Sequence, residues 1–194
     1  PDMATTTVVS DGSLLNPSVF IITLLLSLKI IYDPSSIMPE VFIQGGEGKL
    51  QAKYSPSEQD KPNIAIVLHP NPKHGGTMDT KVNYAAFKVM KDAGFSTLRI
   101  NFRGVGKSDG VFDNGQGELS DAAAALDWIE RQNLDYGQCW VSGFSFGSLI
   151  CMQLIMRRPE VNNFIAISPQ PNVYDFSFLA PCPTSGQVIY SDND

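Results

Sequence analysis

From residue 38 onward, short apolar runs alternate with segments of helical periodicity. Strands separated by helices are joined by crossover connections, which place the strands in parallel. Strands are predicted at residues 41–43, 50–54, 64–68, 96–102, 139–141, 164–167 and 188–190, and helices at residues 84–93, from the N-cap Ser120 onward and at residues 146–158. The sequence therefore predicts an α/β fold: a doubly wound, mostly parallel sheet with helices on both faces.

Composition limits the classes of protein that this chain can belong to. Of its 194 residues, 43% are hydrophobic and 18% charged, which suits one folded core rather than disorder. The net charge of -6 is opposite in sign to the basic charge that a nucleic-acid-binding protein usually carries. The three cysteines, Cys139, Cys151 and Cys182, form no CxxC pair. We therefore expect no metal site, buried thiols at the first two positions, and a reducing, cytoplasmic setting.

Residues 1–37 differ in character from the rest and are predicted to form an N-terminal extension to a partial domain at residues 38–194. The apolar run at residues 19–31 is shorter than the roughly 20 residues that a membrane-spanning helix needs. No basic region precedes it, as a secretory signal would require. It is interpreted as a peripheral segment, an extra packed element or a membrane anchor, and membrane contact is expected only there. Met38 is a candidate natural start.

Residues 143–147 read Gly-Phe-Ser-Phe-Gly, between a predicted buried strand and a predicted helix. A sharp strand-to-helix turn strains the backbone of its serine, so the residues two positions away must be small. The turn exposes the hydroxyl and aims the positive end of the helix at the reacting centre. We therefore predict Ser145 as the nucleophile of a serine hydrolase. The alternative is a turn without chemistry; Ser142 and Ser148 lack the flanking glycines.

Several further motifs occur in an order that resembles one family. They are Met38-Pro39-Glu40, His69-Pro70 with Gly75-Gly76-Thr77-Met78, the run from Asn101 to Ser108, and Gly117-Glu118 with Asp121, Ala124, Ala125 and Trp128. With the serine motif, they make residues 38–194 similar to the α/β-hydrolase superfamily, and within it to a group of small, lidless hydrolases. The resemblance implies an esterase- or peptidase-like activity without metal or organic cofactor.

The loop after the strand at residues 64–68 is predicted to complete the site. In α/β hydrolases, the oxyanion is held by one backbone N–H from this loop and one from the residue after the nucleophile. Pro70 and Pro72 have no N–H, so Asn71 is the candidate by position, and Phe146 is the other donor. The family pattern has a second histidine where Asn71 stands, so this loop departs from it.

The acid and the base are implied by the resemblance. The family places an aspartate in the loop after the seventh strand, where Asp194 stands, with Asp192 as the alternative. Because the base follows the nucleophile in chain order, His69 and His74 are expected to shape their loop by hydrogen bonds instead. The catalytic histidine is expected beyond residue 194. The 194-residue polypeptide alone is therefore expected to be nearly inactive.

The leading prediction is a hydrolase that cleaves an ester, thioester or amide of a small-molecule or peptide acyl substrate through an acyl-enzyme on Ser145. One alternative is a non-catalytic binding module with the same fold. Another is nucleotide binding, because Gly106-Lys107-Ser108 resembles the end of a P-loop. However, Asn101 stands where that motif needs glycine, and no helix is predicted directly after Ser108. The substrate and the oligomeric state are not readable from the sequence.

Overall fold

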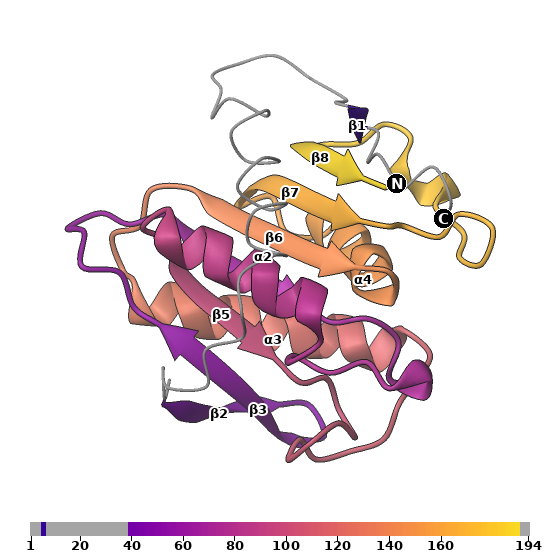
Figure 1. Cartoon of the computed structure of the whole chain (residues 1–194), viewed down its shortest axis with the longest axis horizontal. Coiled ribbons are helices and arrows are strands. Elements are labelled where there is room, and N and C mark those ends of the chain that lie inside the picture. Colours follow the sequence, from indigo (N-terminus) through magenta and orange to yellow (C-terminus); the bar gives the residue numbers. More distant parts are fainter. Residues whose placement is uncertain (1–4, 7–38, 191–194) are drawn as a thin grey trace.

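The computed structural model describes residues 5–6 and 39–190, which form one eight-stranded sheet flanked by helices (Figure 1). The strands are β1 (Thr5–Thr6), β2 (Glu40–Gly45), β3 (Gly48–Ser55), β4 (Ile64–Leu68), β5 (Ser96–Ile100), β6 (Cys139–Phe144), β7 (Val161–Ile167) and β8 (Ser185–Ile189). The helices are α2 (Lys81–Asp92), α3 (Gln116–Gln132) and α4 (Phe146–Ile155), with 3-10 turns η1 (Pro72–His74) and η2 (Ser177–Leu179).

The sheet is parallel at its centre and antiparallel at its edges. Its strand order is β1-β8-β7-β6-β4-β5-β3-β2. Strands β5, β4, β6, β7 and β8 pair in parallel, whereas the β2–β3 hairpin and β1 pair antiparallel. All five residues of β4 are buried, as a strand covered on both faces requires. The predicted doubly wound α/β fold is confirmed.

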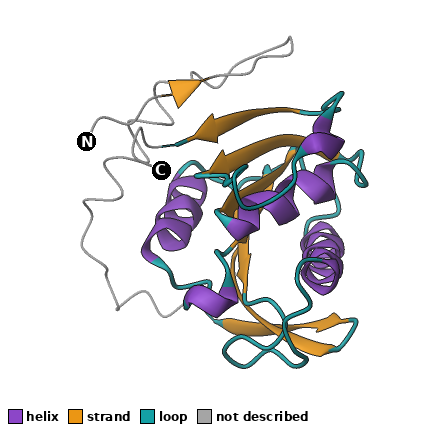
Figure 2. Ribbon diagram, turned by 90° about the vertical axis from the view of Figure 1, so that its right-hand side faces the viewer, coloured by secondary structure: helices purple, strands orange, loops and turns teal. Residues whose placement is uncertain are grey.

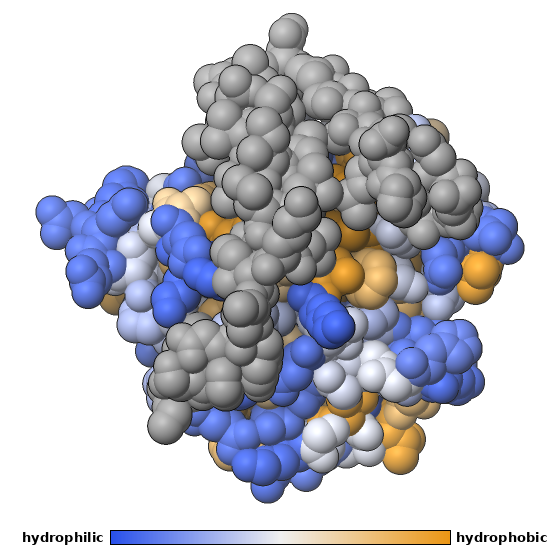
Figure 3. All heavy atoms as spheres, in the orientation of Figure 1, coloured by the Kyte–Doolittle hydropathy of each residue, from blue (hydrophilic) through white to orange (hydrophobic). Residues whose placement is uncertain are grey.

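Helices cover the two faces of the sheet, and each face has its own apolar core (Figure 2). Helix α2 packs on β4, β5 and β6, while α3 and α4 pack against each other and the opposite face. On the α2 face, apolar side chains gather near the middle of the molecule and hydrophilic residues mostly surround them (Figure 3). Within the described part of the chain, no helix is long and apolar enough to cross a membrane.

Helix α3 begins five residues before the predicted start, so the prediction of Ser120 as its N-cap is wrong. The N-cap is Gly115, at φ 116°, a conformation that glycine adopts without strain. The carboxylate of Glu118 reaches back and accepts the N–H groups of Gly115 at 2.7 Å and of Asp113 at 2.8 Å. The third residue of the helix therefore binds the backbone N–H of the N-cap, as the glutamate of a capping box does, and fixes the start of the helix at Gly115.

Helix α4 also differs from the prediction, because it ends at Ile155 rather than at residue 158. Arg157 nevertheless donates to the carbonyl of Gln153 at 3.0 Å, so it stabilises this terminus as expected of a cation there. Arg158 instead forms ion pairs with Asp127 and Glu160. The prediction of an N-terminal extension at residues 1–37 lies outside the described residues, apart from Thr5 and Thr6 of β1.

The three cysteines are unpaired, and the predicted burial of Cys139 and Cys151 is confirmed. Burial raises the pKa of both thiols well above the usual range, so they stay protonated. Cys182 is exposed in the connection between β7 and β8. No group of three potential metal ligands occurs in the described residues.

Candidate active site

Ser145 lies on the sharp turn between β6 and α4, as predicted. Its backbone has φ 54° and ψ -113°, a strained conformation for a residue other than glycine. Neither flanking glycine has room for a side chain. A Cβ on Gly143 would lie 2.1 Å from the carbonyl oxygen of Gly147, and one on Gly147 would lie 2.3 Å from that of Leu68. The turn therefore requires small residues on both sides of the serine.

The hydroxyl of Ser145 points away from the core. The residue is half-buried, and its Oγ donates to Oε1 of Gln170 at 3.0 Å, in the loop after β7. Ser148, the nearby serine without flanking glycines, is buried, and its hydroxyl hydrogen-bonds the carbonyls of Gly143 at 2.8 Å and Ile167 at 2.9 Å. Ser148 thus fastens the turn, while Ser145 presents its oxygen outward.

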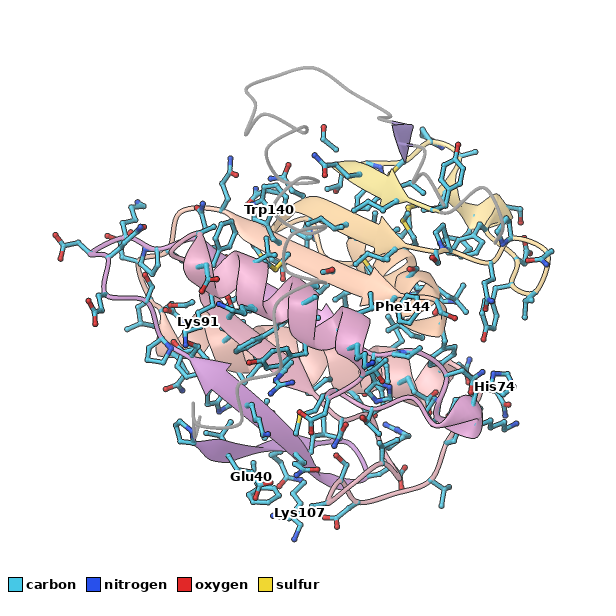
Figure 4. The ribbon with its side chains drawn as sticks, viewed as in Figure 1. Glu40, His74, Lys91, Lys107, Trp140 and Phe144 are labelled. Atoms are coloured by element: carbon cyan, nitrogen blue, oxygen red, sulfur yellow. The ribbon has the colours of Figure 1, made fainter. Side chains whose placement is uncertain are left out.

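A pocket of about 350 Å³ opens in front of Ser145 at the carboxyl ends of the central strands. It is lined by Pro70, Asn71, His74, Gly75, Gly76, Thr80, Phe144, Ser145, Gln170, Val173 and Tyr174. Figure 4 shows two of these, Phe144 at the end of β6 and His74 on η1, at the same end of the sheet. Clefts at this edge of an open parallel sheet are the usual ligand sites of such folds.

The two predicted oxyanion residues lie beside this pocket. Phe146 is the first residue of α4, and its N–H belongs to the helix terminus that has no intrahelical acceptor. Asn71 is the N-cap of η1 and lines the pocket directly. Within the described part of the chain, neither backbone N–H donates to a protein acceptor. Asn71 is among the residues that line the pocket, whereas Phe146 is buried directly behind Ser145 in the chain.

His69 is fully buried, and both of its ring nitrogens are engaged. Nε2 accepts the N–H of Phe102 at 3.0 Å, so Nδ1 carries the proton and donates to the carbonyl of Pro70 at 2.7 Å. Burial is the largest influence on this ring and lowers its pKa to about 4, while the bond to Pro70 opposes that shift. The ring is neutral at pH 7 and joins the loop after β4 to the end of β5. Its predicted role in shaping the loop is confirmed.

Residues 49–190 match the sequence model of the X-Pro dipeptidyl-peptidase (S15) family. The chain is an α/β hydrolase of the S15 family. An uncharacterised protein of Rickettsia prowazekii is 51% identical over 160 residues, which are 81% of this chain and 67% of that protein. These relationships bear out the resemblance read from the sequence motifs.

Solved structures of other α/β hydrolases show the same architecture. A protein of unknown function from Agrobacterium tumefaciens is 56% identical with a TM-score of 0.74, over 76% of this chain and 68% of that one. A serine hydrolase without a lid from Xanthomonas campestris is 26% identical with a TM-score of 0.70, over 84% and 86% of the two chains. The expected lidless type is thus represented among the structural relatives of this α/β hydrolase.

Of the residues considered for the base and the acid, the structure describes only the two histidines, neither of which was predicted to be the base. His74 is exposed on the pocket rim, and its side chain forms no hydrogen bond within the described residues, so the prediction that it shapes the loop by hydrogen bonds is wrong. The hydroxyl of Ser145 bonds to Gln170 instead. Asp192 and Asp194 lie outside the described residues, so the assignment of the acid stays a prediction.

The P-loop-like segment has a structural role in this α/β hydrolase. Lys107 forms an ion pair with Glu40 at 2.7 Å, away from the pocket (Figure 4). The hydroxyl of Ser108 donates to the carbonyl of Asn101 and accepts the N–H of Gln51. Helix α3 starts well after this turn, so no helix N-terminus is available there to bind phosphates. This geometry does not support nucleotide binding.

Gln170 is the site residue that the sequence analysis missed. It follows β7 in a loop without a recognisable motif, yet it contacts the predicted nucleophile, Ser145. One signal pointed to it: it stands just beyond the carboxyl end of a predicted parallel strand, where sites of this fold gather.

Proposed function

We propose that Ser145 is the nucleophile of a serine hydrolase that cleaves a carboxylic ester, thioester or amide through an acyl-enzyme. One observation carries the proposal. A strained serine presents its hydroxyl to a pocket beside two backbone N–H groups that have no acceptor in the described structure. Backbone strain of this kind is retained where chemistry needs it.

In the proposed reaction, Oγ of Ser145 bonds to the carbonyl carbon as a base removes its proton. The carbonyl oxygen becomes negative and is held by the N–H groups of Phe146 and Asn71. The base then gives the proton to the leaving group as the bond to that group breaks. A water molecule next attacks the acyl-enzyme, releases the acid and restores the serine.

The base in this proposal is a histidine beyond residue 194, oriented by Asp194. His69 is unsuited to the role because both of its nitrogens are engaged and it is buried away from the pocket. A histidine acts on a serine only within hydrogen-bond reach of its oxygen, and in this structure Gln170 occupies that position. We therefore propose that the hydroxyl leaves Gln170 when the histidine is in place.

A neutral acyl group suits the pocket better than a peptide with a free N-terminus. The lining side chains that the structure describes include no aspartate, glutamate, lysine or arginine. A dipeptidyl peptidase must bind the ammonium group of its substrate, and a buried ammonium needs a partner of opposite charge. Hydrolysis of p-nitrophenyl butyrate is thus expected to exceed that of Gly-Pro-p-nitroanilide in kcat/KM by at least about tenfold. The reverse order would refute this preference.

The nucleophile is tested by labelling the natural full-length protein with a fluorophosphonate and locating the added mass by peptide mass spectrometry. The modification is expected on Ser145 in the folded protein and on no residue after unfolding in urea. Modification at another serine would reject the assignment. A folded protein that hydrolyses no ester and takes no label would instead support the binding-module alternative.

A further inference from the structure

We propose that Tyr174 is a positioning residue that fixes the two oxyanion-binding segments relative to each other. The inference rests on the proposed function, because it assigns Tyr174 a task in the same site. Tyr174 lies in the loop after β7 and lines the pocket beside Gln170. No motif or family pattern in the sequence pointed to it.

One side chain contacts both oxyanion residues. The hydroxyl of Tyr174 accepts a hydrogen bond from Nδ2 of Asn71 at 3.0 Å. Its ring packs on the buried ring of Phe146, with the centroids 5.8 Å apart and the planes tilted by 58°. Asn71 in the loop after β4 and Phe146 at the start of α4 are more than 70 residues apart in the chain, and Tyr174 bridges them. The relative position of the two N–H groups therefore depends on this tyrosine.

The Asn71 side chain is held at both ends of its amide. Its Oδ1 accepts the N–H of Lys73 at 2.9 Å, while Nδ2 donates to Tyr174. Its own carbonyl accepts the N–H groups of His74 and Gly76, so the loop is also closed on itself. Among the described residues, the bond to Tyr174 is the only hydrogen bond that joins this loop to the loop after β7. Without it, the loop would keep its shape but lose its anchor across the pocket.

Tyr174 is itself held in place by a turn that also presents Gln170. The N–H groups of Val173 and Tyr174 both donate to the carbonyl of Gln170, at 3.0 and 2.9 Å. The side chain of Gln170 accepts the hydroxyl of Ser145, and Tyr174 accepts from Asn71. One short turn thus contacts the nucleophile and the oxyanion loop together.

The effect is expected in kcat rather than in KM. The negative oxygen exists only in the transition state, so an error in donor position weakens transition-state binding without weakening substrate binding. Removing one oxyanion donor lowers the rate by about 10²–10³. Loosening a donor that remains present should lower it less. We expect Tyr174→Phe, which removes only the hydroxyl, to lower kcat by about tenfold and to change KM by less than about twofold.

The test measures hydrolysis of a p-nitrophenyl ester by the natural full-length protein and its variants. The matched control is Tyr54→Phe, because Tyr54 also bonds an asparagine, accepting from Nδ2 of Asn133 at 3.1 Å, and does not line the pocket. It should retain the wild-type kcat. Equal kcat in Tyr174→Phe and the wild type would overturn the inference. So would a raised KM at unchanged kcat, which would assign Tyr174 to substrate binding.

A double variant separates positioning from a general loss of stability. Asn71→Ala keeps the backbone N–H but removes the partner of Tyr174. If Tyr174 acts through Asn71, adding Tyr174→Phe to Asn71→Ala lowers kcat by no more than about twofold further. A second full tenfold loss would overturn the inference. A wrong proposed function would give a different result. The fluorophosphonate would then not label Ser145 in the wild-type protein, and no oxyanion would form there for Tyr174 to position.

Discussion

Replacing Ser145 with alanine is expected to lower kcat for ester hydrolysis by about 10⁶-fold, because it removes the proposed nucleophile and with it the proposed acyl-enzyme route. The fold should survive. The Ser145 hydroxyl makes one hydrogen bond to a protein group, to Gln170, among the described residues. Removing a half-exposed partner of this kind costs about 1 kcal/mol or less of unfolding free energy. Turnover of p-nitrophenyl butyrate and urea denaturation of the same preparation measure the two effects.

Ser142→Ala is the matched control, three residues earlier in the chain, in β6. Ser142 is fully buried, and among residues 39–190 its hydroxyl has no hydrogen-bond partner, so its burial is unfavourable. Alanine at this position should leave kcat unchanged and raise the free energy of unfolding by about 1 kcal/mol. Residual kcat above about a hundredth of wild type in Ser145→Ala, with Ser142→Ala unaffected, would show that another group performs the chemistry.

The fold could be predicted because its signals are local. An apolar run such as residues 64–68 stands out against its polar flanks, and β4 has those bounds. The errors lie at element ends. Ser120 is a good N-cap by residue type, yet Glu118 and the permissive Gly115 start α3 earlier. The residue at which a helix begins depends on which side chain reaches the free N–H groups at its terminus, and residue type alone does not decide this.

The candidate site was predictable only in part, for the same reason. Ser145 carries a local motif, and the position of Asn71 follows from the proline pattern and the fold. Gln170 and Tyr174 carry no such pattern. Tyr174 meets Asn71 across 103 residues of sequence, and the contact exists only because β4 and β7 end at the same edge of the sheet. Long-range contacts between loops follow from the assembled sheet, so a single sequence does not reveal them.

Gly147→Ala is expected to damage both the fold and the site. Its Cβ would lie 2.3 Å from the carbonyl oxygen of Leu68 and 2.8 Å from that of His69, and both are backbone atoms that have little room to move. The start of α4 must therefore shift away from the end of β4. Overpacking of this kind costs about 1–3 kcal/mol of unfolding free energy, and backbone contacts place this case at the upper end.

The same shift should separate the two oxyanion donors. Phe146 begins α4, whereas Asn71 follows β4, so moving the helix away from that strand widens the space between their N–H groups. A misplacement of about 1 Å costs about 10² in rate, so kcat should fall by at least about that factor in Gly147→Ala. The control is Gly46→Ala in the β2–β3 turn, where the nearest atom to an added Cβ is 3.6 Å away. Equal unfolding free energies and equal kcat values for the two variants would contradict this prediction. The close approach of α4 to β4 would then not explain the glycine at residue 147, and only the strained backbone of Ser145 would remain as a reason for the motif.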